Sequence, residues 1–296
     1  MQLRDVLKRL IQIGFFHFTF GMIKYFVDSK WMDSDKAKRV IFDRNIFLKH
    51  FIDMYAVRFP NYRSLEIGPY MSPLLDATNA DYFDVLNTDE LIERSKSENG
   101  PANLVVPVNF VGPEASPKYI PERYPVIVSS HVLEHQTDLI SHLNNINEIL
   151  VPGGIYIAFI PDLRYCFDHF TQPSTISQVL RSYLLNEKSH TLENFLIDRL
   201  ETAHNQTIQH WKGKHGTRKI SNLNHNSEVL EYLKEFENSI NTVHLDVHAW
   251  RFTPYTFGQI VMTLEKLELV SLRLKELRAT LPGNNEFWAV FQRTNE

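Results

Sequence analysis

The sequence has little of what marks a secreted or a metal-binding protein. Cys166 is the only cysteine among 296 residues, so the chain cannot form an internal disulfide bond. Neither a CxxC pair nor an HExxH sequence is present, and these are the patterns in which zinc ligands are most easily recognised. We therefore expect a protein of a reducing compartment, the cytoplasm, that carries no metal.

Long apolar runs and a dominant charge are missing as well. No stretch of about 18 apolar residues, the length needed to cross a bilayer, stands out, and no signal-peptide cleavage pattern is evident. The 31 basic and 35 acidic residues give a formal charge of −4, which does not indicate general binding to nucleic acid. We expect no transmembrane helix and no nucleic-acid partner.

What is present suits an α/β domain, and its clearest part runs from Tyr124 to Asp162. The β-branched run Val126–Val128 is typical of a strand that is buried on both faces. A second apolar run, Ile155–Ile160, has the same character. Between them, Pro152-Gly153-Gly154 is expected to end a helix. The segment therefore predicts one strand–helix–strand unit.

The helix of this unit is expected to begin after Thr137 as N-cap. Its apolar stripe consists of Leu139, Leu143, Ile146 and Leu150. Two buried strands around a helix form a right-handed crossover in a parallel sheet. Because ligands of such sheets bind at the carboxyl ends of the strands, the polar residues 129–135 and 162–164 are expected at a binding site.

The same unit resembles a known enzyme family. Its pieces SSHVLEH, PGG and PD are similar to the fourth and fifth strands of class I S-adenosylmethionine (SAM)-dependent methyltransferases. The resemblance covers roughly residues 60 to 296 and is strongest for methyltransferases encoded with bacterial surface-polysaccharide genes. Those proteins also carry pieces like His210-Trp211-Lys212-Gly213 and His248-Ala249-Trp250.

The resemblance implies a Rossmann-like, seven-stranded sheet closed by an antiparallel hairpin, expected over Glu268–Lys275 and Phe287–Arg293. Residues 1–59 would form an N-terminal helical segment and residues 60–162 the SAM-binding half of the core. Residues 163–250 would form a helical insertion that caps the substrate, because they are too many for a structureless loop. Residues 251–296 would supply the last helix and the closing hairpin.

The glycine-rich turn of the family would lie directly after a first strand, Ser64–Ile67. Its expected cofactor-binding residues are Glu66, Gly68, Pro69 and Tyr70, and only Gly68 stands where the family has two or three glycines. The turn would bring backbone N–H groups to the methionine carboxylate of SAM or of its product S-adenosylhomocysteine (SAH). The ring of Tyr70 would face the sulfonium.

Further cofactor contacts are implied at the next strand ends. Asp84, near the end of a second strand (residues 80–86), would accept hydrogen bonds from the ribose hydroxyls. Asn109, at the end of a third strand (residues 104–110), would accept one from the adenine amine. Ser130 and His131 would line the cofactor.

Methyl transfer to a hydroxyl requires an aligned acceptor and a base that removes its proton. His248 is the first expected base, because Asp246-Val247-His248 is expected where the insertion rejoins the core, opposite the cofactor strands. Alternation would place both polar side chains on one face of this segment, and a neighbouring carboxylate could orient the ring. His131 is the second, and Asp162 and Asp246 are the carboxylate alternatives. The expected substrate-binding residues are Arg164, His169, His210, Trp211, His215 and Arg251.

The histidines of this region also offer nitrogen ligands to a metal. The set in question is His210, His215, His244, Asp246 and His248. Scattered histidines in a polar pocket more often form hydrogen bonds or face substrate, so the expectation remains that no metal is used.

Residues 1–26 are amphipathic and aromatic, with Phe15, Phe16 and Phe20 close together. We expect them to pack on the domain or on a second subunit in a homodimer. The alternative is a helix at a membrane surface, which would place the protein at the inner face of the membrane.

The sequence thus predicts SAM-dependent O-methylation of a sugar or glycan intermediate. One alternative acceptor is a small lipid-like or aromatic metabolite. The other alternative is a catalytically inactive, methyltransferase-like binding subunit, because the glycine turn is reduced and Asn109 replaces an acid of the family pattern.

Overall fold

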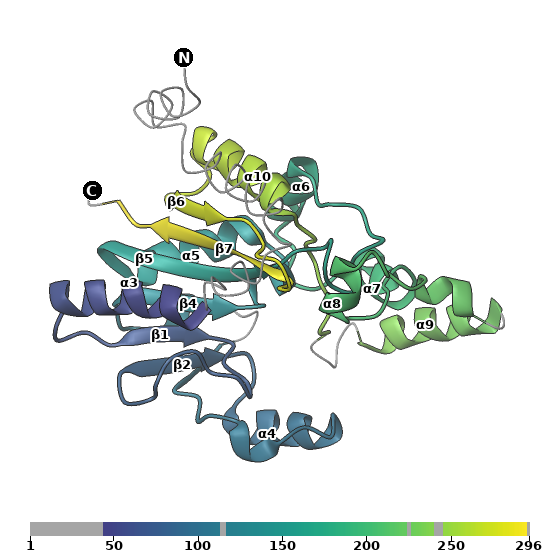
Figure 1. Ribbon diagram of the computed structural model, residues 1–296, viewed down its shortest axis with the longest axis horizontal. Coiled ribbons are helices and arrows are strands. Elements are labelled where there is room, and N and C mark those ends of the chain that lie inside the picture. Colours follow the sequence, from purple (N-terminus) through teal and green to yellow (C-terminus); the bar gives the residue numbers. More distant parts are fainter. Residues whose placement is uncertain (1–43, 113–116, 224–225, 240–244, 295–296) are drawn as a thin grey trace, which may run out of the picture.

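The computed structural model describes residues 44–112, 117–223, 226–239 and 245–294 (Figure 1). The aromatic N-terminal segment, with its two proposed contacts, and His244 lie outside these residues. None of the helices within the described ranges is both long and apolar enough to cross a bilayer.

The core is one seven-stranded sheet with the strand order β3-β2-β1-β4-β5-β7-β6. The strands are β1 (Ser64–Ile67), β2 (Ala80–Asp84), β3 (Phe110–Val111), β4 (Tyr124–Ser130), β5 (Leu150–Pro161), β6 (Arg273–Arg278) and β7 (Glu286–Gln292). All pairings from β3 to β5 are parallel, whereas β7 runs antiparallel to both β5 and β6. The predicted fold class, a Rossmann-like sheet with an antiparallel closing hairpin, is confirmed.

The two central strands are buried on both faces, as their continuous apolar runs require. Val126 and Val128 pack with the cluster under α3, while Ile127 between them belongs to the larger cluster on the opposite face. Along β5 the alternation is the same, with Ile157 on the first face and Tyr156 on the second. Successive side chains of a strand point to opposite faces, so each central strand contributes to both halves of the core.

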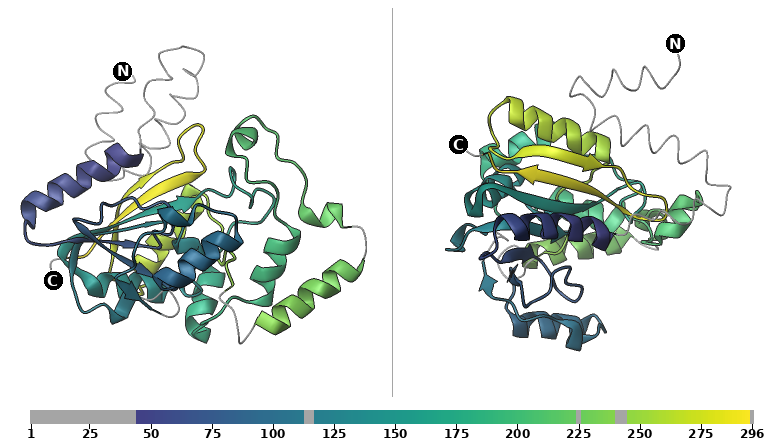
Figure 2. Two further views of the ribbon diagram at one scale, coloured as in Figure 1. Left: turned by 90° about the horizontal axis from the view of Figure 1, so that it is seen from below. Right: turned by 60° about the vertical axis from the view of Figure 1, so that its left-hand side comes forward.

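Helices cover both faces of this sheet (Figure 2). They are α3 (Arg44–Arg58), α4 (Thr88–Ser97), α5 (Leu139–Ile149), α6 (Ile176–Leu185), α7 (Leu192–Leu200), α8 (Thr207–Trp211), α9 (Asn226–Ser239) and α10 (Pro254–Lys266), with the short 3₁₀ helices η2 (Ala102–Leu104), η4 (Pro117–Tyr119), η5 (Leu133–His135) and η6 (Lys219–Asn222). Helix α3 packs on one face, and α5 and α10 pack on the other. Helices α7, α8 and α9 lie beyond the carboxyl ends of the parallel strands (Figure 1).

Two local predictions around α5 are wrong. Its N-cap is Asp138, whose side chain accepts a hydrogen bond from Ser141 N at 2.9 Å, whereas the Thr137 hydroxyl donates to the carbonyl of Glu187. Pro152-Gly153-Gly154 belongs to β5 rather than to a turn. The register with β4 shifts there, with Tyr124 opposite Leu150 but Val126 opposite Ile155, so the extra residues form a bulge at the start of the strand.

Candidate functional site

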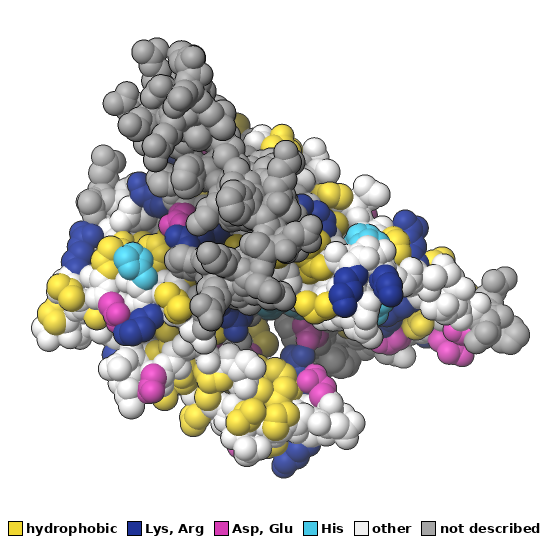
Figure 3. Space-filling view, in the orientation of Figure 1, with side chains coloured by type: hydrophobic (Ala, Val, Ile, Leu, Met, Phe, Trp, Pro, Cys, Tyr) yellow, Lys and Arg dark blue, Asp and Glu magenta, His cyan; other side chains and the backbone are white. Residues whose placement is uncertain are grey.

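A cavity of about 800 Å³ opens at the carboxyl ends of β1, β2 and β4. One side consists of the turn after β1, the end of β2 and residues 130–132; the other consists of residues 135–137 and parts of the insertion. Figure 3 shows the surface hollowed between α4 and the insertion, with side chains of both charges at the edge. Ligand sites of open parallel sheets lie at this position, where neighbouring strands send their connections to opposite faces.

The turn after β1 depends on Gly68. Its φ is +68°, and a Cβ at this position would lie 2.6 Å from Cγ2 of Val132. Only glycine therefore permits this close approach to the loop after β4. The buried Glu66 carboxylate fixes the rest of the turn by accepting hydrogen bonds from the backbone N–H groups of Leu74 and Leu75, each at 2.9 Å. Burial raises the pKa of Glu66 to about 7, against the lowering effect of those hydrogen bonds.

Tyr70 also lines the cavity, with a φ of +40°. Its hydroxyl donates to Glu98 at 2.9 Å, and the guanidinium of Arg94 lies 5.1 Å from the centre of its ring. One cation therefore already lies over this ring, within the range of a cation–π interaction. Pro69, the remaining turn residue predicted for the cofactor, is part of the same wall.

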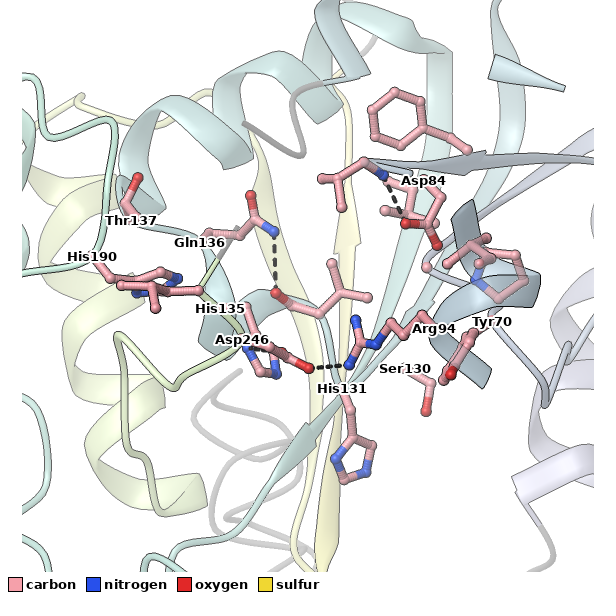
Figure 4. Close-up of a pocket in the computed structure, with 18 of the residues that line it drawn as sticks. Tyr70, Asp84, Arg94, Ser130, His131, His135, Gln136, Thr137, His190 and Asp246 are labelled. Atoms are coloured by element: carbon pink, nitrogen blue, oxygen red, sulfur yellow. Dashed lines mark hydrogen bonds and ion pairs between the residues drawn. The ribbon is translucent and has the colours of Figure 1, made fainter. Parts of the chain in front are cut away.

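Asp84 stands at the last position of β2 and lines the cavity (Figure 4). One of its carboxylate oxygens accepts hydrogen bonds from the backbone N–H groups of Val85 at 2.7 Å and Leu86 at 3.3 Å. These bonds hold the carboxylate at the strand end, at the edge where the Gly68 turn begins, because β1 and β2 are parallel and adjacent.

The structure corrects the placement of Asn109. The third strand is Phe110–Val111 rather than residues 104–110, so Asn109 precedes it instead of ending it. The side-chain oxygen of Asn109 accepts a hydrogen bond from Tyr82 N at 2.8 Å, and the backbone N–H of Asn109 donates to the carbonyl of Tyr82 at 2.9 Å. Asn109 is not among the described residues that line the cavity, since its amide is used to join β3 to β2.

Ser130 and His131, at the end of β4, line the cavity as expected for their position. The Ser130 hydroxyl accepts a hydrogen bond from Arg44 at 3.1 Å. His131 has a φ of +54°, and its Nε2 lies 3.2 Å from a carboxylate oxygen of Glu286. Burial disfavours the charged ring, but the hydrogen bond to Glu286 and the charge of Glu134 raise the pKa of His131 above its usual value.

His135 and Asp246 meet on the insertion side of the cavity. The Nδ1 atom of His135 lies 3.2 Å from a carboxylate oxygen of Asp246 and 3.2 Å from the carbonyl of Val247. Asp246 also forms an ion pair with Arg94 of α4, drawn in Figure 4 as a link across the cavity. Burial, and then the charge of nearby His248, hold the pKa of His135 well below its usual value.

His248 occupies a different place from the one predicted. It is buried, with 5% of its surface exposed, and its Nδ1 lies 2.5 Å from Asp168. Although burial disfavours its charged form, Asp168 raises the pKa of His248. The carboxylate that orients this ring is thus Asp168, while Asp246 lies beside His135. His248 is absent from the described residues lining the cavity.

Glu134 lies at the centre of three histidines. Its carboxyl group is fully buried, and neither oxygen has a hydrogen-bond partner among the described residues. His131, His135 and His248 each place a ring nitrogen 3.7–3.8 Å from it. Burial raises the pKa of Glu134 above its usual value. Its backbone carbonyl accepts from the N–H groups of Ala249 and Trp250, which brings residues 245–251 against the loop after β4.

Asp162 and Arg164 form an ion pair in which the carboxylate is buried and the guanidinium is 40% exposed. The guanidinium of Arg164 donates to both carboxylate oxygens of Asp162, at 2.9 and 2.6 Å, and the hydroxyl of Thr280 donates to Asp162 as well. Neither residue is among the described lining residues of the cavity. Asp162 thereby ties the end of β5 to the segment after β6.

The remaining residues predicted for substrate binding also lie elsewhere. His169, His210 and His215 form a separate cluster, and Trp211 stacks on Tyr165 with ring centres 3.9 Å apart. Arg251 is buried, donates from Nε to Asp168 at 3.2 Å, and lines a second, smaller cavity of about 360 Å³. The proposed metal set is divided, because His210 and His215 belong to that cluster while Asp246 and His248 surround His135.

Several lining residues of the main cavity were not predicted from sequence, namely Arg44, Arg94, Lys188, His190 and Phe236. They lie on α3, on α4 and in the insertion, far along the chain from the strand ends. No local pattern marks them: Arg94 meets Asp246 across 152 positions of sequence. His135, in contrast, belongs to the HVLEH sequence, and residues 129–135 were expected at a binding site because they follow a buried strand.

No family model and no curated protein sequence matches the chain. Among solved structures, it is similar to the CurJ carbon methyltransferase, with 14% identity over 88% of this chain and 56% of that one and a TM-score of 0.40. It thus spans little more than half of that structure. It is also similar to a SAM-dependent methyltransferase from Clostridium acetobutylicum ATCC 824, with 9% identity over 83% and 90% of the two chains and a TM-score of 0.41.

A third similar structure is the magnesium protoporphyrin IX methyltransferase ChlM from Synechocystis PCC 6803 with bound SAH. The identity is 9% over 92% of this chain and 95% of that one, and the TM-score is 0.36. All three TM-scores lie below 0.5, so the strand order of the sheet is what defines the fold of this chain.

Proposed function

We propose that the chain is a SAM-dependent methyltransferase and that the cofactor binds in the 800 Å³ cavity. The observation that carries the proposal is the meeting, in one cavity, of the Gly68 turn, the Asp84 carboxylate and the loop after β4. They occupy the carboxyl ends of three adjacent parallel strands of a sheet with an antiparallel last strand.

The residues present fit such a cofactor. The turn at Gly68 has no room for a Cβ and would offer its backbone N–H groups to a carboxylate. Asp84 would accept the ribose hydroxyls, whereas the ring of Tyr70 already has the Arg94 guanidinium 5.1 Å from its centre. When bound, the cofactor supplies an electrophilic methyl group.

The acceptor would bind on the other side of the cavity, between residues 135–137 and the insertion. That side carries hydrogen-bonding groups from Gln136, Thr137, Ser189 and His190, with Phe236 as an apolar surface. Many polar groups around one aromatic side chain suit a polyhydroxylated ring. We therefore propose that the acceptor is a sugar or a glycan intermediate and that the product is a methyl ether.

Removal of the acceptor proton falls to His135 in this proposal. A base must be unprotonated, and of His131 and His135, which both line the cavity, His135 is the one whose pKa is lowered, to about 3, so its ring is neutral at pH 7. Its Nδ1 faces a backbone carbonyl and carries hydrogen, so the nitrogen left to accept a proton is Nε2, which lies 3.8 Å from the buried Glu134 carboxyl. Asp246 beside Nδ1 would stabilise the imidazolium that forms.

Calorimetric titration with SAH tests the cofactor assignment. We expect micromolar binding, about −8 kcal/mol. Asp84→Asn keeps the oxygen that accepts from Val85 and Leu86 but removes the charge, and Asp84→Ala removes both, so binding should weaken by about 1.5–3 kcal/mol.

The matched control is Asp89→Asn, which removes an exposed carboxylate from the first turn of the neighbouring helix α4. Its affinity should equal that of the wild type. No binding to the wild type, or equal loss in the Asp84 and Asp89 variants, would remove the support for a cofactor at this edge.

A panel of acceptors tests the substrate class. The protein, SAM and individual nucleotide sugars or short glycans would be incubated, and products would be scanned by mass spectrometry for the mass of one added methyl group. Methylation of an aromatic or lipid-like metabolite instead would replace the sugar assignment. Cofactor binding without transfer to any acceptor class would favour an inactive binding subunit.

A further inference from the structure

Three histidines from distant segments meet outside the cavity, at the junction of the insertion with the end of β5. His169 follows β5, His210 lies on α8, and His215 lies in the loop after α8. One ring nitrogen from each lies within 4.8 Å of the other two. The rings of His169 and His215 are parallel with centres 3.6 Å apart, and Nδ1 of His210 lies 3.1 Å from Nδ1 of His215.

The hydrogen bonds of two of these rings determine which nitrogen carries hydrogen. Nδ1 of His169 lies 2.8 Å from the carbonyl oxygen of Arg164, and Nε2 of His210 lies 3.0 Å from the carbonyl oxygen of His204. A carbonyl oxygen only accepts, so both nitrogens must be donors. In the neutral rings, Nε2 of His169 and Nδ1 of His210 therefore keep their lone pairs.

The groups that meet at this point are of one chemical kind. Among the described residues, the group that converges here contains imidazoles and no carboxylate. A histidine whose N–H donates to a backbone carbonyl keeps its other ring nitrogen free to bind an ion, which is the usual arrangement of a metal ligand.

We propose that His169, His210 and His215 form a binding site for one divalent transition-metal ion, with Zn²⁺ as the ion that best suits three imidazoles. Zinc sites with three protein ligands keep a fourth position for water or for a substrate oxygen. The site lies outside the proposed methyl-transfer cavity and does not depend on that proposal.

One nitrogen–nitrogen distance already suits zinc, whereas the ring planes of His169 and His215 would have to change. Zinc–nitrogen bonds of about 2.0–2.1 Å in a tetrahedron place two ligand nitrogens roughly 3.3 Å apart, against 3.1 Å between the Nδ1 atoms of His210 and His215. His215 would then carry its proton on Nε2. The stacked rings of His169 and His215 would tilt, because parallel lone pairs cannot meet at one ion.

Such an ion would connect the insertion to the core. It would join the loop after β5 to α8 and to the turn at Gly213 and Gly216, both of which have positive φ. Trp211 already links the same parts by stacking on Tyr165 and donating to the carbonyl of Asn284 at 2.8 Å. The metal would add a second, stronger link at this junction.

The test uses the full chain without a histidine tag, stripped of metal with a chelator and titrated with Zn²⁺ by calorimetry. The wild type should bind one equivalent with a sharp end point, and Co²⁺ should give the visible absorption of a four-coordinate site. Substitution of any one ligand by glutamine (His169→Gln, His210→Gln or His215→Gln) should weaken binding by more than about 10²-fold, the upper loss seen for residues that only orient ligands.

His204→Ala is the matched control. Its ring touches the same cluster, but Nδ1 accepts from Gln206 N and Nε2 faces the carbonyl of Lys214, so it has no nitrogen left for a metal. This variant should bind Zn²⁺ as the wild type does. Thermal melts of each variant without metal show whether a loss of binding reflects unfolding.

Failure of the wild type to bind one equivalent would overturn the proposal. Full binding by all three glutamine variants would overturn it too, and loss in Glu134→Gln would then place the ion among Glu134, His135 and His248, the second group with metal-ligand spacing.

Discussion

The individual side chains around Glu134 differ in protonation because their surroundings differ. His131 and His248 each face a carboxylate, Glu286 and Asp168 respectively, and the pKa of each ring is raised. His135 lies next to His248, with ring centres 4.8 Å apart, and its pKa is lowered. Groups whose surroundings move their pKa values apart can serve as acid and base in one site.

This difference yields a pH prediction for turnover on the acceptor found by the screen. A base must be neutral, and acid inactivates it only near its own pKa. With His135 as base, turnover should stay flat as pH falls from about 8 to 6, because its pKa lies below the usual histidine value. With His131 or His248 as base, turnover should already fall there, because their pKa values are raised.

The corresponding variant is His135→Gln. It should lose about 10²–10⁴ in turnover, the usual contribution of a positioned base, and bind SAH like the wild type. His131→Gln is its control from the same cavity. Near-normal turnover by His135→Gln together with an inactive His131→Gln would move the role to His131, as sequence proposed second.

Among the elements, the turn after β1 requires a glycine at position 68 and is held by the ionisable carboxyl group of Glu66. Gly68 makes the approach to Val132 possible, and Glu66 holds residues 74 and 75. The folded-state pKa of Glu66 is about 7 because its carboxyl group is buried, against 4.5 for an ordinary glutamate. A raised carboxyl pKa means that the folded chain binds the proton more tightly than the unfolded chain does.

We therefore expect Glu66 to make the protein less stable as pH rises from about 4.5 to 7, by an amount on the order of 3 kcal/mol. In Glu66→Gln this pH dependence should be gone. The measurement is urea unfolding of both proteins at several pH values, and the quantity is the difference in their free energies of unfolding. A difference that does not change over this window would show that Glu66 ionises normally in the fold.

How far each element could be predicted depends on whether its cause is local. The apolar runs of β4 and β5 mark strands buried on both faces, and the structure has both. Helix α8 was not predicted, since a helix of five residues is too short to show a repeating pattern of apolar side chains. The last strands shifted by a few residues, with β6 beginning at Arg273 instead of Glu268.

The site was predictable only where it coincides with strand ends. Gly68, Asp84 and His131 lie at such ends and line one cavity. The pairing of Arg94 with Asp246 and that of His248 with Asp168 join segments whose approach depends on the path of the insertion. No spacing in the sequence encodes that path, so the partner of His248 could not be named from sequence.

At the scale of the whole molecule, a buried histidine limits stability in acid. His142 on α5 is 3% exposed, and neither of its ring nitrogens has a hydrogen-bond partner among the described residues. Burial lowers the pKa of His142 from 6.5 to about 4. The unfolded chain therefore takes up this proton first, and the stability present above about pH 6.5 is lost as pH falls towards 4.

We expect the free energy of unfolding of His142→Leu to fall less between pH 7 and 4 than that of the wild type, by up to about 3 kcal/mol. At pH 7 the variant should be as stable as the wild type or more so, since two buried nitrogens without hydrogen-bond partners are removed. Thermal or urea unfolding between pH 4 and 7 measures it. His50→Leu, at an exposed position of α3, should behave like the wild type. Equal acid sensitivity in His142→Leu and the wild type would contradict the expectation.

The central claim is that the cavity at the ends of β1, β2 and β4 is a SAM site, and a crystal structure of the chain grown with SAH tests it most directly. We expect the ligand between the Gly68 turn and the loop after β4, with its ribose on Asp84 and its sulfur towards His131 and His135. An empty cavity at saturating SAH, or SAH bound elsewhere on the molecule, would contradict the claim.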